Sequence, residues 1–380
     1  MKFFSIVSEF NPFHTGHKHL IEQTKAKTGT DAIVCIMSGS MVQRGDVAIY
    51  DKWTRAKAAI ENGADLVVEL PVCYVLQSAD VFARGAVEII NAIGSEGIAF
   101  GSECDDSELL FKIAKIKAEE PDLYKKVLSD KLAEGAGYPV ACEAAIRAVL
   151  GNLPKEITLP NSTLATAYLT ALCKINPALK VHIEKRVGDY HSTVLDGMFQ
   201  SATAIRQNIL FGDKKSNYSL CTSDEIYDIN RISAFILGFF RTATPESLEE
   251  IAGMEPGLAK RLIDKSKESI SLEEFISSSA SKRYTLHRIR RVILCSLLKI
   301  KSAPSPKYLR VLALNHKGAQ ILKEIKKMSD IEIITKITNS SQRNNPMLAQ
   351  DISSTDIAAL CAGKKASMDY TTTPIVTGKE

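Results

Sequence analysis

The sequence lacks an apolar run that approaches the roughly 18 residues needed to span a bilayer. Its first apolar stretch, Phe3 to Val7, meets Glu9 too soon to form the core of a secretion signal. No Cys-x-x-Cys pair occurs, and neighbouring members of the eight cysteines stand more than 30 residues apart. These absences argue against a membrane protein, a disulfide framework and a zinc knuckle, and they predict a cytoplasmic protein.

The chain also has no internal repeat of fixed period and no low-complexity tract. Its composition is average, because 45% of the residues are hydrophobic and 24% are charged, as in globular proteins. At about 150 residues per domain, the 380 residues predict two or three domains.

A large excess of one charge is absent as well, since 48 basic residues face 44 acidic ones and the net charge is only +4. The basic residues are nevertheless segregated. Between Lys282 and Lys327, thirteen Lys and Arg accompany one acid, Glu324, so this segment carries +12 and the remainder carries −8. Such a segment suits a polyanionic partner, because each neutralised phosphate releases counterions.

Strand and helix patterns alternate in the N-terminal half. The pattern is typical of a doubly wound parallel α/β sheet, whose ligands bind at the carboxyl ends of the strands. It predicts a first domain at 1–212 with a helical insertion at about 105–175. The expected strands are 3–10, 32–37, 64–70, 97–100 and 179–185, and the expected helices are 16–27, 52–62, 80–93, 107–118, 124–133, 140–150 and 163–174.

Strand signals nearly stop after Asp213. We therefore expect a second, mostly α domain at 213–380, which contains the basic segment. Its expected helices are 226–240, 247–252, 258–267, 272–278, 284–300, 308–314 and 318–327.

The first predicted strand runs into Asn-Pro-Phe-His-Thr-Gly-His at residues 11–17, and a helix follows. Gly16 lets the backbone approach a ligand closely, and the free amides of a helix N-terminus bind anions. His14 and His17 flank those amides and can donate to phosphoryl oxygens as charge builds in a transition state. The ordinary alternative is a helix N-terminus with surface histidines, but the location in the first strand-to-helix turn favours a phosphate site.

A second motif, Ser-Ala-Thr-Ala-Ile-Arg, occupies residues 201–206. Ser201 is a plausible N-cap, and Thr203 and Arg206 share one face of the predicted helix. A hydroxyl and a guanidinium on one face suit a triphosphate or a leaving pyrophosphate. Alone, the motif is equally compatible with ordinary helix capping, and it becomes informative only beside the histidine motif.

Together, the two motifs resemble the nucleotidylyltransferase superfamily, which shares its core with class I aminoacyl-tRNA synthetases. More closely, a series of runs along nearly the whole chain resembles the bacterial tRNA(Met) cytidine acetate ligase family. These runs are residues 9–17, 37–39, 43–45, 51–55, 63–71, 100–103, 201–206 and 281–286.

The resemblance implies a Rossmann-like core of the HUP type and a ligase that makes acetyladenylate and pyrophosphate from ATP and acetate. The acetyl group would then pass to N4 of the wobble cytidine of elongator tRNA(Met). ATP would enter with Mg²⁺, although no carboxylate pair is an evident metal ligand. No protein partner is indicated.

The resemblance also implies site residues. The catalytic set is His14, His17, Thr203 and Arg206. The ATP-binding set is Val7, Ser8, Glu9, Phe10, Asn11, Pro12, Phe13, His14, Thr15, Gly16, His17, Lys18, His19, Leu20, Gly101, Asn161, Arg186 and Ser201.

One basic helix is the candidate RNA surface. Leu286, Ile289, Ile293 and Leu297 keep helical spacing and predict a buried stripe. Arg283, His287, Arg290 and Arg291 fall within another sector of the same helix. We expect Lys282, Arg283, Arg290 and Arg291 to contact tRNA phosphates, and Tyr284 and Tyr308 are candidates for stacking on unpaired bases.

Two other functions compete with the ligase. One is a nucleotidylyltransferase that adenylylates a small-molecule phosphate in cofactor synthesis, and the large basic helical segment argues against it. The other is a catalytically silent RNA-binding protein, and the intact histidine, threonine and arginine set argues against that.

Overall fold

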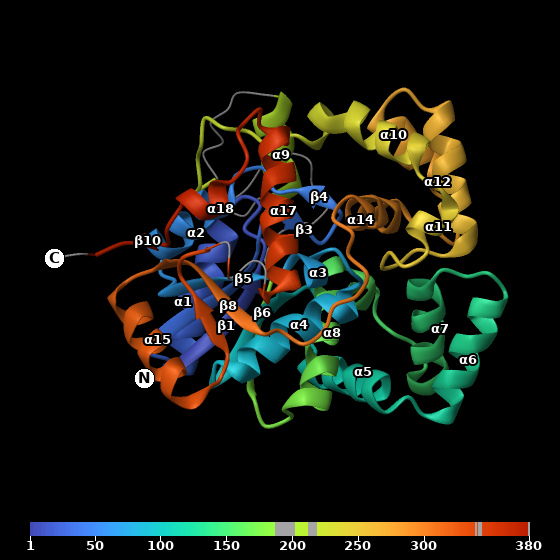
Figure 1. Ribbon diagram of the computed structural model, residues 1–380. Coiled ribbons are helices and arrows are strands. Elements are labelled where there is room, and N and C mark those ends of the chain that lie inside the picture. The colour runs from blue at the N-terminus through green and yellow to red at the C-terminus, as the bar shows by residue number, and fades with distance from the viewer. Residues whose placement is uncertain (187–201, 212–218, 339, 341–343, 379–380) are drawn as a thin grey trace.

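The computed structural model describes the whole chain except residues 187–201, 212–218, 339, 341–343 and 379–380. One sheet runs through its centre in the strand order β10-β8-β5-β2-β1-β6-β7, and β9 pairs with β8 (Figure 1). The strands are β1 Phe3–Ser8, β2 Ala32–Ser38, β5 Leu66–Leu70, β6 Gly97–Ser102, β7 Lys180–Lys185, β8 Tyr308–Leu314, β9 Glu332–Ile334 and β10 Ile375–Val376.

The five N-terminal strands of this sheet are parallel, as predicted. Strands β2 and β5 are buried along their whole length because helices cover both faces. Helices α1 (Thr15–Thr28), α2 (Lys52–Glu61) and α9 (Ala202–Phe211) pack on one face through Ile21, Trp53 and Ile205. Helices α4 (Ala79–Ala92) and α8 (Pro160–Ile175) pack on the other. The predicted doubly wound α/β class is confirmed.

The helices of the N-terminal half agree with the predicted ones to within a few residues, apart from the short helix Val72–Val75, which was not predicted. They are α1 Thr15–Thr28, α2 Lys52–Glu61, α3 Val72–Val75, α4 Ala79–Ala92, α5 Ser107–Glu119, α6 Asp122–Ala133, α7 Tyr138–Leu150 and α8 Pro160–Ile175, with a 3-10 turn at Lys155–Thr158. Helices α5 to α8 form the insertion between β6 and β7.

The second half contains a helical group, residues 233–297, after which the chain returns to the sheet. The helices are α9 Ala202–Phe211, α10 Ser233–Thr242, α11 Pro245–Leu248, α12 Pro256–Glu268, α13 Leu272–Ser279, α14 Leu286–Leu297, α15 His316–Met328, α17 Pro346–Cys361 and α18 Met368–Thr371, with a 3-10 turn at Ile229–Ile232. Figure 1 shows α10 to α13 on the side of the molecule away from β10.

The prediction of a helix at 308–314 is wrong. These seven residues form β8, are all buried, and lie antiparallel to β5 with Arg310 opposite Glu69. A short apolar run has no periodicity that separates a buried strand from a buried helix, and only the distant partner decides. The C-terminal segment therefore contributes strands to the main sheet and is not wholly helical.

A small hairpin unanticipated from the sequence follows β2. Its strands are β3 Met41–Val42 and β4 Asp46–Val47, and Gly45 turns between them with φ of 77°. The middle of α14 lies directly against this turn, since a Cβ on Gly45 would come within 2.5 Å of the Arg291 amide nitrogen. The hairpin thus joins the carboxyl edge of the sheet to the helical group. In the part of the chain that the structure describes, no helix combines the length and apolarity needed to cross a bilayer.

Candidate nucleotide-binding active site

The loop between β1 and α1 holds its two histidines through the backbone. His14 is the N-cap of α1, and its Nδ1 accepts a hydrogen bond from the Gly16 amide at 3.1 Å. The Nδ1 atom of His17 accepts from the His14 amide at 3.2 Å. The two rings stack with centroids 3.8 Å apart. The pair therefore forms a reciprocal capping box made of imidazoles.

These contacts set the chemistry of both rings. Burial lowers the pKa of His14 to about 3, and Arg186 and Arg206 add to the effect. Burial also lowers the pKa of His17 well below its usual value, with His14 and Arg186 as further causes. Each ring is neutral at pH 7, and because Nδ1 accepts, Nε2 carries the proton. Each histidine thus offers one fixed N–H donor.

The preceding turn is pinned from several sides. Asn11 accepts from the Ile49 amide through Oδ1 at 2.8 Å. The Leu220 amide donates to the Phe13 carbonyl at 3.0 Å. Phe10 and Phe13 are buried among the apolar residues of the sheet face. Of the predicted loop, these two phenylalanines thus position the backbone, and their side chains are apolar.

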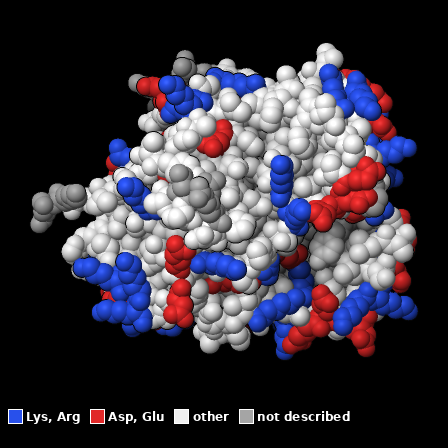
Figure 2. Space-filling view, viewed as in Figure 1, with Lys and Arg blue, Asp and Glu red and all other residues white. Residues whose placement is uncertain are grey.

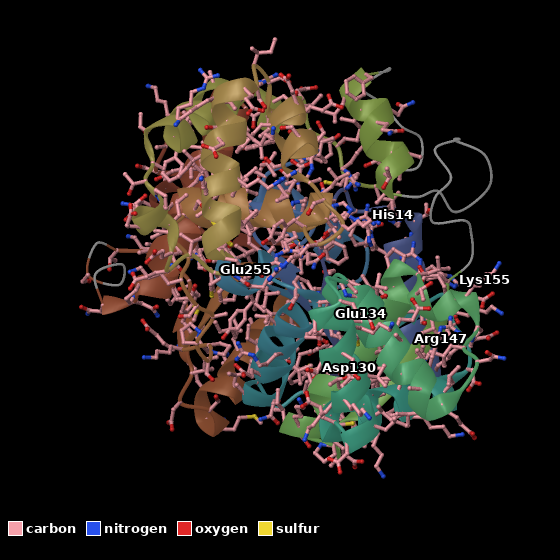
Figure 3. All side chains as sticks on the ribbon, turned by 90° about the vertical axis from the view of Figure 1, so that its right-hand side faces the viewer. His14, Asp130, Glu134, Arg147, Lys155 and Glu255 are labelled. Atoms are coloured by element: carbon pink, nitrogen blue, oxygen red, sulfur yellow. The ribbon has the colours of Figure 1, made fainter. Side chains whose placement is uncertain are left out.

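The second motif meets the first. On α9, Arg206 donates through Nη1 to the Asn11 carbonyl at 2.8 Å and through Nη2 to Thr203 Oγ1 at 3.1 Å. The predicted common face of Thr203 and Arg206 is present and is turned to the histidine loop. Ser201 lies outside the described residues. Figure 3 shows His14 between α9 and the helices of the insertion.

Three more predicted residues come together at the ends of β6 and β7. Arg186 Nη1 donates to Asn161 Oδ1 at 3.2 Å. A Cβ on Gly101 would lie 3.0 Å from Arg186 Cγ, so the absent side chain leaves space for the arginine stem. Besides burial, the charge of Arg186 helps to lower the pKa of both histidines.

Glu103 is a site residue that the sequence analysis missed. Its Oε1 accepts from Asn161 Nδ2 at 2.5 Å, and its Oε2 accepts from the Ser162 amide at 2.7 Å. It therefore caps the N-terminus of α8 and orients Asn161. The sequence held one signal for this capping role. An acidic residue stands directly after a strand, and a helix that begins with proline follows further along the chain.

Glu9, Gln43 and Arg55 form a second group at the carboxyl ends of β1 and β2. Glu9 Oε1 accepts from the Gln43 amide at 2.6 Å. Arg55 is fully buried, and its guanidinium donates to the carbonyls of Glu9 at 2.6 Å and Ser38 at 3.2 Å, and to that of Gly39. Arg55 thus ties two strand ends together, a role that no local pattern indicates.

The remaining loop residues lie at the margin. Lys18 is exposed and stands 4.0 Å from Glu22, and His19 Nε2 stands 3.9 Å from Glu184. The rest of the predicted set runs along the end of β1 and the start of α1: Val7, Ser8, Pro12, Thr15 and Leu20. No group of three metal-binding side chains occurs among the described residues.

The predicted RNA strip is not a single exposed face. Lys282 and Arg283 are exposed, and Arg283 pairs with Glu255 at 2.7 Å. Arg290 stands 3.6 Å from Asp46, and Arg291 donates to the Gln43 carbonyl at 3.3 Å. The last two therefore lie against the hairpin, a contact that a helical wheel cannot show.

Two other expectations for this region are wrong, and a third stays a prediction. Leu286 is half exposed and does not extend the buried stripe. Tyr308 is buried in β8, so it is not available to a base. Tyr284 donates to Glu255 at 3.0 Å and lies under Arg283 and Arg288. Its ring therefore already contacts two guanidinium groups, and its stacking on an unpaired base stays a prediction.

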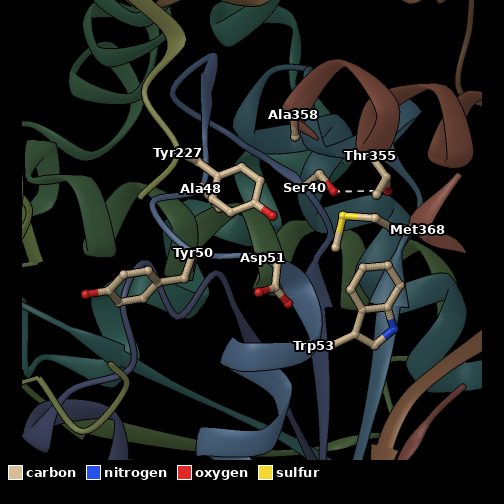
Figure 4. A pocket seen from close by; sticks show the side chains of 9 residues that line it. All are labelled: Ser40, Ala48, Tyr50, Asp51, Trp53, Tyr227, Thr355, Ala358 and Met368. Carbon is tan, nitrogen blue, oxygen red and sulfur yellow. Dashed lines mark hydrogen bonds between the residues drawn. The ribbon is translucent and has the colours of Figure 1, made fainter. Parts of the chain in front are cut away.

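A separate shallow pocket lies beyond the hairpin (Figure 4). Ser40 donates to Thr355 there at 3.1 Å. It shares no residue with the predicted site. Its lining is Ser40, Ala48, Tyr50, Asp51, Trp53, Tyr227, Thr355, Ala358 and Met368.

Comparisons with known proteins agree with this geometry. The family model described as HIGH Nucleotidyl Transferase matches residues 1–372. The chain is 34% identical to a tRNA(Met) cytidine acetate ligase of Acetivibrio thermocellus, over 99% of this chain and 100% of that protein. It is 35% identical to one of Clostridium perfringens, with the same coverage.

Two solved structures also resemble the chain over nearly its whole length. Thermotoga maritima TmcAL bound with alpha-thio ATP superposes with a TM-score of 0.89 at 28% identity, over 99% of both chains. The apo form of the same protein gives a TM-score of 0.91, again at 28% identity and over 99% of both chains. The likeness therefore includes both the sheet and the helical group.

Proposed function

The chain belongs to the HIGH nucleotidyl transferase family, in which its relatives are tRNA(Met) cytidine acetate ligases, and on that premise we propose that it is an ATP-dependent ligase of the same kind. It activates acetate as acetyladenylate and transfers the acetyl group to N4 of the wobble cytidine of elongator tRNA(Met). The observation that carries the proposal is the pair of neutral imidazole donors at the N-terminus of α1, beside Arg206.

In the first half-reaction an acetate oxygen attacks the α-phosphorus of ATP, and pyrophosphate leaves. Negative charge moves to the bridging oxygen and the leaving pyrophosphate. The Nε2–H groups of His14 and His17 and the amides of α1 donate to those oxygens without reorganising. Thr203 and Arg206 approach from α9 and add a hydroxyl and a charged fork. Mg²⁺ carried by the triphosphate would offset part of its negative charge.

The nucleoside half of ATP lies on the β6 and β7 side. A parallel sheet binds ligands at its carboxyl edge, and Gly101, Asn161 and Arg186 occupy that edge beside the histidines. Asn161 keeps its amide fixed by Glu103, so it presents a single orientation to a bound nucleotide.

In the second half-reaction the cytidine amine attacks the acetyl carbonyl and AMP leaves. The RNA approaches over the start of α14, where Lys282 and Arg283 are exposed and Arg290 and Arg291 border the hairpin. This side of the hairpin leads directly to Glu9 and the histidine loop.

The proposal is tested by measuring pyrophosphate release from ATP with and without acetate, and with and without tRNA(Met). We expect acetate-dependent exchange of labelled pyrophosphate into ATP in the absence of tRNA. We also expect one acetylcytidine per AMP when tRNA is added. Exchange that does not depend on acetate but does depend on a small-molecule phosphate would contradict the ligase. It would support a nucleotidylyltransferase of cofactor synthesis instead.

A further inference from the structure

The second half-reaction, which rests on the proposed function, must dispose of a proton. An amine that becomes an amide loses one hydrogen, so some group close to the acetyl carbonyl has to accept it. The base must therefore be a group with a free lone pair at the carboxyl edge of the sheet.

The two histidines do not meet that requirement. Each ring already uses its Nδ1 lone pair to accept a backbone hydrogen bond, from Gly16 for His14 and from His14 for His17. The remaining Nε2 atoms carry protons in the neutral rings. Both histidines are thus donors. A proton on Nδ1 would break the backbone hydrogen bonds that position the two rings.

Two nearby carboxylates also lack a free oxygen atom, because hydrogen bonds or an ion pair occupy both of their oxygens. Glu103 accepts from Asn161 through Oε1 and from Ser162 through Oε2. Asp46 accepts from the Val47 amide through Oδ1, and its Oδ2 faces Arg290 at 3.6 Å. Both oxygens of each group are therefore in use.

Glu9 differs from both. Its Oε1 is held by the Gln43 amide at 2.6 Å, and among the described residues nothing hydrogen-bonds its Oε2. Its backbone is fixed too, because Arg55 donates to the Glu9 carbonyl at 2.6 Å. Glu9 also stands two residues before Asn11, whose carbonyl binds Arg206 of the catalytic set. Gln43 and Arg55 thus hold the Glu9 carboxyl group and backbone at the carboxyl edge of the sheet, in the same loop as the phosphate-binding groups.

We propose that Glu9 is the general base of the acetyl transfer. The N4 lone pair forms the new bond to the carbonyl carbon of acetyladenylate, and the N4 proton passes to Glu9 Oε2. The bond between that carbon and the phosphate oxygen breaks, and AMP leaves with the electron pair. Glu9 then returns the proton to solvent before the next turnover.

The surroundings of Glu9 suit this role. Burial raises the pKa of Glu9, and the hydrogen bond from Gln43 and the charges of Arg206, Arg44 and Arg55 oppose that rise. On α8, burial raises the pKa of Tyr168, and the charge of Glu9 adds to that rise. A carboxylate raised above its ordinary pKa is a stronger base while it stays ionised at neutral pH.

The test uses Glu9→Gln, which can still accept from the Gln43 amide but cannot take a proton. Transfer from synthetic acetyladenylate to tRNA(Met) is measured in a single turnover, beside acetate-dependent pyrophosphate exchange without tRNA. We expect transfer to fall by about 100-fold or more, and to fall at least tenfold more than exchange. Equal losses in both half-reactions would overturn the proposal.

The pH profile separates a base from a merely structural carboxylate. In the wild-type protein the transfer rate should rise with pH on a limb whose midpoint lies above 4.5, the usual value of a glutamate pKa. Glu9→Asp should keep that limb with a lower plateau, and Glu9→Gln should lose it. If Glu9→Gln keeps this rise of the transfer rate with pH, Glu9 is not the base. The phosphate of the departing AMP would then be the group that accepts the proton.

Glu103→Gln is the matched control, because it removes one negative charge from the same edge of the sheet. It should slow adenylation at least as much as transfer, since its oxygens orient Asn161. If the wild-type protein shows no acetate-dependent exchange, the proposed function fails. If it shows exchange and transfer, and Glu9→Gln keeps the transfer, only the assignment of Glu9 fails.

Discussion

Two regions of the molecule, the nucleotide loop and the start of the basic helix, hold their histidine and arginine side chains in different ways. In the nucleotide loop, His14 is only 4% exposed and is oriented by backbone amides, so it is neutral and fixed. At the start of α14, the Arg283 side chain is 62% exposed and is paired with Glu255. The first arrangement suits donation in a transition state, and the second suits a charged partner that approaches from solvent.

Arg291 lies between these two extremes. It belongs to the basic helix, but its guanidinium donates to the Gln43 carbonyl, and the Gln43 amide donates to Glu9. One residue, Gln43, therefore links the helical group to the nucleotide loop. The comparison predicts that residues of the loop control rate, that Arg283 controls salt-dependent affinity, and that Arg291 affects both.

The largest effect is expected at Arg206. Arg206→Ala removes a charged fork and the anchor of the Asn11 carbonyl, so adenylation should fall by about 1,000-fold, at the upper end of losing one transition-state donor. Thr203→Ala removes one hydroxyl and should cost about tenfold. Pyrophosphate exchange without tRNA measures both. A variant of Arg206 that forms adenylate normally but loses tRNA affinity would move this motif to the RNA surface.

The histidines should show the next largest effect, of about tenfold to 1,000-fold on adenylation for each alanine variant. His14→Ala also removes an N-cap, which should lower the free energy of unfolding by about 1 kcal/mol. His14→Asn keeps a capping oxygen but lacks the Nε2–H donor. We therefore expect His14→Asn to unfold like the wild type in urea while staying slow in pyrophosphate exchange. Recovery of both properties would make His14 a structural cap only.

Burial of neutral His14 also predicts a pH dependence of stability. Its pKa is about 3 in the folded protein, against 6.5 for the unfolded side chain. The unfolded state therefore binds more protons between these values, and stability falls as the pH drops from about 6.5 towards 3, by up to about 1.4 kcal/mol per pH unit. Urea unfolding at pH 7 and pH 5 measures the slope. His14→Asn should show a shallower slope than the wild type, and equal slopes would contradict the buried neutral ring.

The loop was more predictable from sequence than the basic helix, and the reason is the range of the interactions. His14, Gly16 and His17 bond to one another within three residues, and Thr203 and Arg206 are three apart on one helix. Strand β8 depends on a partner about 240 residues away, and no local pattern contains that information. Arg55 was missed for the same reason, and the role of Glu103 becomes clear only from its contact with Asn161, 58 residues away.

The docking of α14 on the hairpin is another long-range contact, and it changes what the basic residues are expected to do. A helical wheel places Arg283, Arg290 and Arg291 on one strip. The fold leaves Arg283 in solvent and turns Arg291 to Gln43. A single variant of each residue therefore separates RNA contact from support of the hairpin, which a triple variant would merge.

The smallest effect is expected at Arg283, and it should appear as a salt slope. Arg283→Gln removes one exposed cation, so the slope of log affinity for tRNA against log salt should become shallower by about one. The loss of affinity should shrink at high salt, because the Debye length falls from about 10 Å at 0.1 M to 3 Å at 1 M. Filter binding over a salt series measures the slope, and pyrophosphate exchange without tRNA is run on the same preparation.

Arg291→Gln provides the contrast in that experiment. Its guanidinium supports the Gln43 carbonyl, so its loss should reduce exchange more than Arg283→Gln does and should change the salt slope less. If Arg283→Gln leaves the slope unchanged, its pairing with Glu255 is a solvated surface contact. The RNA surface would then be sought on α15, where basic side chains gather at the lower left of Figure 2. These are Lys317, Lys323, Lys326 and Lys327, and because they lie far from α14 in Figure 1, their variants would alter the slope independently of the hairpin.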